Sequence, residues 1–171
     1  MKILLPIYDY DDAKLIIDFV SNFNWPPHAC FKLLHVITSQ VGEEEEAKAE
    51  KLASIRLADI MYRLKSVLPS AVADSELMAG TPVLEIVNFA SQWQADMIVM
   101  GSRTRVGIDA CLTGSVSKGV VMQAPCSVVT IKPPVRHEGH PFKQVRGGDG
   151  QGAVGAVHPL PESKEVHLLT G

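Results

Sequence analysis

The sequence predicts an α/β fold, in which helices cover both faces of an open, twisted, Rossmann-like sheet of parallel strands. Between residues 2 and 132, short apolar runs alternate with segments whose apolar residues recur at helical spacing. Continuous apolar runs are typical of strands that are buried on both faces. Strands that alternate with helices pair in parallel through right-handed crossovers, so the helices fall on the two faces of one sheet.

The first half of this domain supplies two strands and two helices. Residues 3–7 are the first apolar run, and a helix is predicted over 11–23, with Asp11 or Asp12 near its start. A second strand follows over 29–37. The next helix is the longest, from about 43 to 68, and the acidic residues of its first turn complement the helix dipole.

The second half continues the alternation. Residues 73–78 predict a weaker strand, and a helix begins at Thr81-Pro82, because proline is well suited to the first helical turn. The last predicted elements are a strand over 96–100, a helix over 114–122 and a strand over 126–131. Residues 1–132 therefore form one domain.

The remaining residues, 133–171, differ in composition. Pro133 and Pro134 end the last strand, and glycine and proline then recur without apolar periodicity. We expect a flexible, Gly/Pro-rich C-terminal tail over 133–171, with a short edge contact from Val166 to Leu169.

Composition and charge exclude several classes of function. The 171-residue chain is 46% hydrophobic and carries a formal net charge of −3, so it offers no basic surface for nucleic acid. No stretch approaches the roughly 20 apolar residues of a membrane span, and the N-terminus lacks the pattern of a signal peptide. We expect a cytoplasmic protein with neither nucleic acid nor a membrane as partner.

The segment 97–117 carries the pattern of an anion-binding cradle. An apolar strand ends at Gly101, a loop containing Gly107 follows, and Gly114-Ser115 opens a helix. Glycines let the backbone approach a phosphate, and the free N–H groups of a first helical turn point toward it. Ligands of doubly wound sheets bind beyond the carboxyl ends of the strands, so the first and fourth strands face one crevice.

The order of these elements resembles the universal stress protein family. The resemblance covers residues 2–132 and rests on the segments 80–87, 95–102 and 124–131, together with Gly114-Ser115. It implies a five-stranded parallel sheet in the order 3-2-1-4-5 and a homodimer formed through the last strand, from Ser127 to Ile131. An uncovered apolar edge tends to be paired, which agrees with such a dimer.

Many members of that family bind ATP, and the resemblance implies an adenine nucleotide, with Mg, at residues 101–117. The implied nucleotide-binding residues are Pro6, Ile7, Tyr8, Val36, Met100, Gly101, Ser102, Arg103, Gly114, Ser115, Val116 and Ser117. In this resemblance the residues from Gly101 onward contact the phosphates, and Pro6, Val36 and Met100 line the base and sugar.

Two positions depart from the family pattern. Thr104 stands at the middle glycine of the phosphate motif, and Tyr8 stands where ATP-binding members carry an aspartate. A tyrosine there removes an acceptor for the ribose hydroxyls, and it can either stack on a purine or fill the pocket. Two hypotheses follow: a stress-response regulator that binds a nucleotide, with at most slow ATP hydrolysis and no catalytic residue, or a dimeric module with a degenerate site that binds an unknown protein partner.

The histidines and cysteines give weaker indications of function. The histidines at 137, 140, 158 and 167 lack the spacing of a zinc site, so no metal site is predicted. The three cysteines are few and odd in number, so no disulfide framework is expected. Cys111 lies in the cradle loop with two arginines, which can lower a thiol pKa, but a passive cysteine is the favoured interpretation.

Overall fold

The computed structural model describes residues 1–38, 42–102, 115–132 and 166–169. Every helix and strand predicted within 1–132 is present, with ends that differ by at most two residues. The elements are β1 Lys2–Pro6, α1 Tyr10–Ser21, β2 Cys30–Ile37, α2 Glu43–Val67, β3 Val72–Ala79, α3 Pro82–Trp93, β4 Met97–Gly101, α4 Ser115–Gln123, β5 Ser127–Ile131 and β6 Val166–Leu169.

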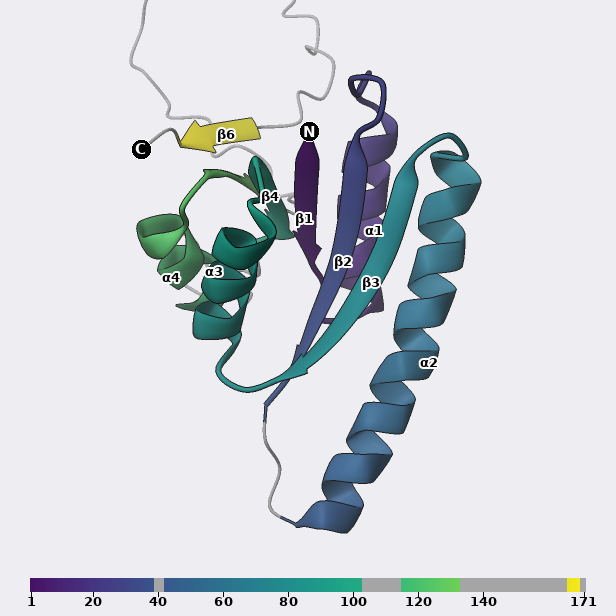
Figure 1. Cartoon of the computed structure of the whole chain (residues 1–171), viewed down its shortest axis with the longest axis vertical. Coiled ribbons are helices and arrows are strands. Elements are labelled where there is room, and N and C mark those ends of the chain that lie inside the picture. Colours follow the sequence, from purple (N-terminus) through teal and green to yellow (C-terminus); the bar gives the residue numbers. More distant parts are fainter. Residues whose placement is uncertain (39–41, 103–114, 133–165, 170–171) are drawn as a thin grey trace, which may run out of the picture.

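The strands form one sheet in the order β3-β2-β1-β4-β5-β6. The first five are parallel, which confirms the expected order 3-2-1-4-5, and α1 and α2 cover one face while α3 and α4 cover the other (Figure 1). The sixth strand, β6, pairs antiparallel with β5, at the residues where an edge contact of the tail was expected. The rest of the tail, 133–165 and 170–171, lies outside the described residues, and a homodimer through β5 stays a prediction.

Asp9, rather than Asp11 or Asp12, is the N-cap of α1. Its backbone is extended, and its carboxylate accepts a hydrogen bond from the N–H of Asp12 at 2.9 Å. The helix therefore begins one residue earlier than expected. Asp11 and Asp12 lie in the first turn, where negative charge complements the helix dipole.

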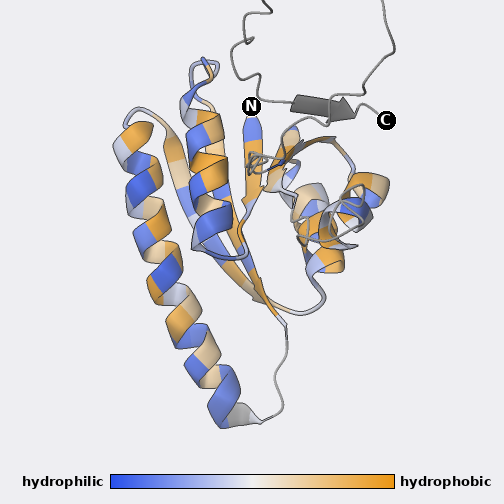
Figure 2. Cartoon of the chain, turned by 180° about the vertical axis from the view of Figure 1, so that it is seen from behind, coloured by the Kyte–Doolittle hydropathy of each residue, from blue (hydrophilic) through white to orange (hydrophobic). Residues whose placement is uncertain are grey.

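The core has two halves, one on each face of the sheet. Ile3 and Leu5 of β1 pack in the cluster under α1 and α2, whereas Leu4 packs in the cluster under α3 and α4. This division follows from the alternation of side chains along a strand. The long helix α2 contributes a stripe of Ala53, Leu57, Ile60 and Leu64, and its other faces are more polar (Figure 2).

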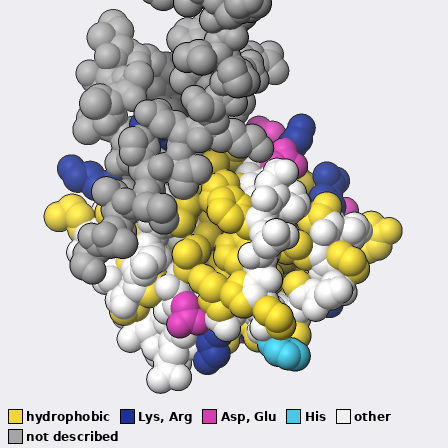
Figure 3. All heavy atoms as spheres, turned by 90° about the horizontal axis from the view of Figure 1, so that it is seen from above, with side chains coloured by type: hydrophobic (Ala, Val, Ile, Leu, Met, Phe, Trp, Pro, Cys, Tyr) yellow, Lys and Arg dark blue, Asp and Glu magenta, His cyan; other side chains and the backbone are white. Residues whose placement is uncertain are grey.

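Hydrophobic side chains also gather at the amino end of the sheet (Figure 3). Met1, Phe23 and Val72 are between 42% and 60% exposed. Trp25 contacts the ring of Phe23 and donates its indole N–H to the carbonyl of Val20 at 2.7 Å. This apolar surface lies at the end of the sheet opposite to the carboxyl ends of the strands.

An ion pair joins β2 to the edge strand β3. The ammonium of Lys32 lies 2.5 Å from Oδ2 of Asp74, directly across the ladder. The hydrogen bond from Lys32, with a second from the backbone N–H of Ser75, lowers the pKa of the Asp74 carboxyl below its ordinary 3.8.

Because the pKa of Asp74 is depressed in the folded state, its contribution to stability is present above pH 3.8 and is lost as the pH falls through the folded-state value. Asp74→Asn is expected to lower the free energy of unfolding at pH 7 by less than about 1 kcal/mol, since the carboxylate is exposed. Urea unfolding at pH 7 and pH 2.5 checks this, and a deficit of equal size at both pH values would contradict it.

No helix within the described ranges is long and apolar enough to cross a bilayer. Among the same residues, no group of three or more histidine, cysteine, aspartate or glutamate side chains is placed to hold a metal ion.

Candidate functional site

The carboxyl ends of β1 and β4 lie side by side at the centre of the sheet. The two strands are parallel neighbours, with Ile3 opposite Met97 and Leu4 opposite Ile98. The chain crosses to one side of the sheet after β1 and to the other after β4, so the strand order reverses between them. Ligands of doubly wound folds bind at this position. The crossover helices α1 and α4 therefore begin at the same end of the sheet as the crevice.

Gly101, the last residue of β4, contacts a buried carboxylate. A Cβ atom added at Gly101 would overlap Oδ1 of Asp12. Asp12 is only 9% exposed, and its other oxygen accepts a hydrogen bond from the backbone N–H of Tyr8 at 3.0 Å. Glycine at this position therefore gives space to an acidic side chain that α1 places beside the carboxyl ends of β1 and β4.

Asp12 is a candidate site residue that the sequence reasoning missed. The sequence pattern indicated Asp12 only as a residue near the start of the first helix. The available signal was its position in the first turn of the helix that directly follows strand one, since that turn lies at the carboxyl end of the sheet. The carboxylate expected at the end of strand one in ATP-binding relatives is absent at Tyr8, but Asp12 brings one to the same end of the sheet.

Ser102 follows Gly101 and is 1% exposed. Its backbone N–H donates to the carbonyl of Ile131 at 2.7 Å, which anchors the end of β4 to β5. Its hydroxyl, in contrast, has no hydrogen-bond partner. Within the described residues, no other buried side-chain nitrogen or oxygen lacks one. A buried hydroxyl without a partner costs free energy, so this atom marks a place where a ligand oxygen would be favourable.

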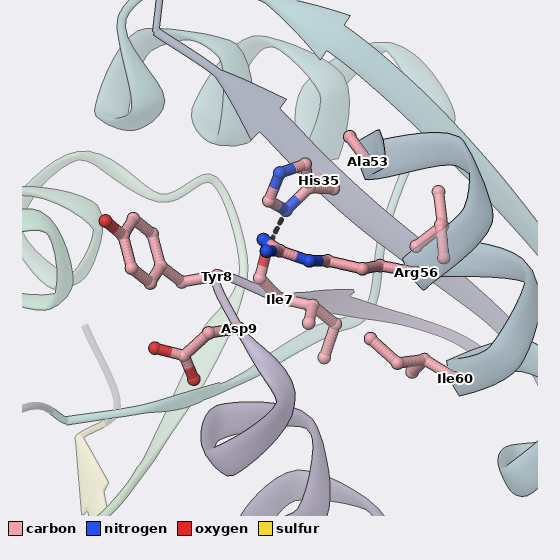
Figure 4. Close-up of a pocket in the computed structure, with 8 residues that line it drawn as sticks. Ile7, Tyr8, Asp9, His35, Ala53, Arg56 and Ile60 are labelled. Atoms are coloured by element: carbon pink, nitrogen blue, oxygen red, sulfur yellow. Dashed lines mark hydrogen bonds between the residues drawn. The ribbon is translucent and has the colours of Figure 1, made fainter. Parts of the chain in front are cut away.

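Tyr8 does not fill a buried pocket. Its side chain is 58% exposed, and Figure 4 shows the ring directed away from His35 and Arg56. Of the two roles left open for this tyrosine, stacking against a ligand at the rim is the one that this exposure favours.

The residues expected to line the base and sugar share one face of the sheet. Val36 and Met100 pack in the cluster beneath α3 and α4. Pro6 is buried and, by strand alternation, lies on the same face as Leu4. Ile7 belongs instead to the cluster beneath α1 and α2.

Residues of the first helical turn of α4 complete the described part of the site. Ser115 is exposed, Val116 is half-buried against the core cluster beneath α3 and α4, and Ser117 is buried. Two predicted site residues, Arg103 and Gly114, lie outside the described residues, as do Thr104 and Cys111.

A small pocket lies on the other face, between α2 and the ends of β1 and β2. It is lined by Ile7, Tyr8, Asp9, His35, Ala53, Arg56, Leu57 and Ile60. Nδ1 of His35 lies 2.8 Å from the carbonyl of Ile7, and Arg56 extends toward both residues (Figure 4). This pocket lies on the face of the sheet that α1 and α2 cover, whereas Val36 and Met100 pack on the opposite face.

Comparisons with known proteins give the family of this chain. The profile of the universal stress protein family matches residues 1–132, which is most of the chain. The chain belongs to the universal stress protein family. Universal stress protein MJ0531 of Methanocaldococcus jannaschii is 29% identical over 122 residues, which are 71% of this chain and 64% of that protein. Universal stress protein Rv2005c of Mycobacterium tuberculosis is 33% identical over 63% of this chain, but the match spans only 33% of its length.

Solved structures of universal stress proteins share the fold. The structure of MJ0577 from M. jannaschii superposes with a TM-score of 0.68 at 26% identity, covering 78% of this chain and 96% of that one. An Archaeoglobus fulgidus universal stress protein in complex with dAMP gives 0.55 at 20% identity, over 77% and 98% of the two chains. An Arabidopsis thaliana family member with AMP bound gives 0.54 at 18% identity, over 78% and 92%.

Proposed function

We propose that this universal stress protein is a stress-response regulatory module that binds an adenine nucleotide in the crevice at the ends of β1 and β4. The observation that carries the proposal is the buried hydroxyl of Ser102, which has no hydrogen-bond partner although it lies at the point where the strand order reverses. The complexes of two structural relatives with AMP and dAMP support an adenine nucleotide as the ligand.

The described residues fit such a ligand. The unpartnered hydroxyl of Ser102 is a donor suited to a phosphate oxygen. The N–H groups of the first turn of α4, which have no acceptor within their own helix, are suited to phosphate as well. Asp12 supplies a carboxylate that can accept hydrogen bonds from ribose hydroxyls, in place of the aspartate that Tyr8 replaces in the family pattern. The motif of residues 101–117 favours ATP with Mg over the monophosphate. The compartment we propose for the protein is the cytoplasm. The role assigned to the nucleotide is to stabilise one state of the protein, without rapid turnover.

Thermal unfolding of the purified chain with ATP, ADP or AMP, each with and without Mg, tests the proposal. A ligand at about 100 times its dissociation constant adds roughly 2.7 kcal/mol to stability. For a domain of this size we expect the unfolding midpoint to rise by about 5–10 °C. No shift with any adenine nucleotide, and no nucleotide released from the denatured protein, would contradict it.

A single hydroxyl deletion tests the place of binding. Ser102→Ala is expected to weaken nucleotide binding by about 3- to 10-fold, since a hydrogen bond contributes about 0.5–1.5 kcal/mol. The same change is expected to leave the unliganded protein no less stable, because it removes an unsatisfied buried group. Calorimetric titration and urea unfolding measure the two effects.

Ser66→Ala is the matched control, because this serine is exposed on α2 and bonds only its own helix. It should change neither nucleotide affinity nor stability by much. Equal affinities for the Ser102→Ala, Ser66→Ala and unmodified chains would move the ligand away from Ser102.

The second candidate function is a protein-interaction module with a degenerate site. The buried carboxyl group of Asp12 against Gly101 favours it, because a carboxylate at this position would repel a phosphate. Tyr8→Asp with Thr104→Gly restores the family pattern at both departures. If these departures are what weaken binding, this double variant should bind ATP more tightly than the unmodified chain in calorimetry, and an unchanged affinity would exclude that explanation.

A further inference from the structure

The two edges of the sheet are protected in different ways. The β3 edge carries Asp74 and Glu76, and an ion pair from Lys32 to Asp74. Charged side chains of this kind discourage a foreign strand from pairing with an edge. At the opposite edge of the described sheet, the protection is different: another strand, β6, covers β5, which would otherwise be the last strand.

The sequence of β5 contains none of the usual protective residues. The strand reads Ser-Val-Val-Thr-Ile, with neither a charged residue nor a proline. It is also anchored firmly, since Val128, Val129 and Thr130 are at most 5% exposed and each is paired with β4. A rigid, uncharged edge strand accepts a further strand readily.

The structure places a strand of the same chain on that edge. The backbone of β6 pairs antiparallel with β5 over four positions, from Val128 opposite Leu169 to Ile131 opposite Val166. This ladder covers the part of β5 that a second copy of the chain would need.

We propose that the outer edge of β5 is a strand-docking surface, that β6 of the same chain is its resident occupant, and that a second copy docks there through its own β5 only when β6 is displaced. Because β6 belongs to the same chain as β5, its advantage over a second copy can be estimated from its effective concentration. A strand joined to its site by a chain segment is present at an effective concentration in about the millimolar range. At micromolar protein, β6 is therefore favoured over a second copy by roughly a hundredfold or more when the two strands pair equally well. This inference is independent of nucleotide binding.

A double proline substitution tests the competition. In an antiparallel ladder the N–H groups of successive residues alternate between facing the partner strand and facing away. His167→Pro with Leu168→Pro therefore removes the N–H that faces β5, whichever of the two it is. Light scattering at micromolar concentrations should find a monomer for the unmodified chain and a dimer for the variant, with dimer association at least about tenfold stronger.

The control carries two prolines elsewhere in the tail, at Ala153 and Val154, and should stay monomeric. Circular dichroism and thermal unfolding confirm that the variants keep the β1–β5 domain. A dimer of the unmodified chain that the β6 prolines leave unchanged would overturn the proposal, and so would a folded double-proline variant that remains monomeric.

A disulfide distinguishes pairing within one chain from exchange between two copies. Thr130 and His167 are directly opposite in the ladder, so Thr130→Cys with His167→Cys, in a background where Cys30, Cys111 and Cys126 are alanine, should oxidise to a monomer with an internal disulfide. Thr130→Cys with Leu169→Cys, two positions out of register, is the control and should oxidise more slowly. Disulfide-linked dimers, or equal rates for the two pairs, would overturn the assignment of β6 as the resident strand.

Discussion

Replacing Phe31 by alanine is expected to lower the free energy of unfolding by about 3–5 kcal/mol, because a large aromatic side chain leaves a cavity in a packed core. Phe31 is 2% exposed in the middle of the cluster beneath α1 and α2. Its ring meets Trp25 edge to face, with centroids 5.3 Å apart, and this contact is lost as well. Thermal unfolding should show a midpoint lower by about 6–20 °C.

Tyr62→Ala provides the control for the loss of an aromatic ring. Tyr62 is 74% exposed on α2, so its removal should change stability by no more than about 0.5 kcal/mol. If the two variants unfolded at similar midpoints, the burial of Phe31 and the arrangement of β2 beneath α1 and α2 would be wrong.

Gly101→Ala is expected to destabilise the protein by about 1–3 kcal/mol and to weaken nucleotide binding together with it. The added methyl group would occupy the position of Oδ1 of Asp12, so the carboxylate must move and its hydrogen bond to the N–H of Tyr8 is strained or lost. Urea unfolding measures the first effect, and calorimetric titration with ATP or AMP measures the second.

A double-mutant cycle identifies the cause. In an Asp12→Ala background the space beside Gly101 is free, so Gly101→Ala should then cost less than about 1 kcal/mol. A cost for Gly101→Ala that is the same in both backgrounds would show that the contact with Asp12 does not determine the need for glycine.

The fold was predictable because its signals are local and repeated. The apolar runs at 3–7 and 96–100 indicated strands buried on both faces, and both are central strands of the observed sheet. Thr81-Pro82 marked the start of α3 to the residue. Asp11 and Asp12, expected near the start of the second element, lie in the first turn of α1, but the sequence did not single out Asp9 as the N-cap because several acidic residues follow one another and only the extended backbone of Asp9 decides between them.

The candidate site was less predictable because its key contacts join residues far apart in sequence. The contact between Asp12 and Gly101 depends on how α1 packs beside β4, which no local pattern encodes. The unpaired hydroxyl of Ser102 is likewise a property of its surroundings. The glycine motif indicated where an anion would bind, but not that a buried carboxylate lies beside it.

The most direct test of nucleotide binding is a ¹⁵N NMR titration of the full chain with ATP and, separately, AMP. The proposal predicts saturable shifts of the backbone amides of Tyr8, Gly101, Ser102 and the first turn of α4, with little change at the amino end of the sheet. Saturable shifts that cluster elsewhere, such as around His35 and Arg56, would show that the ligand binds at another site and would contradict the proposed site at the ends of β1 and β4. No saturable shift with either nucleotide would contradict binding itself.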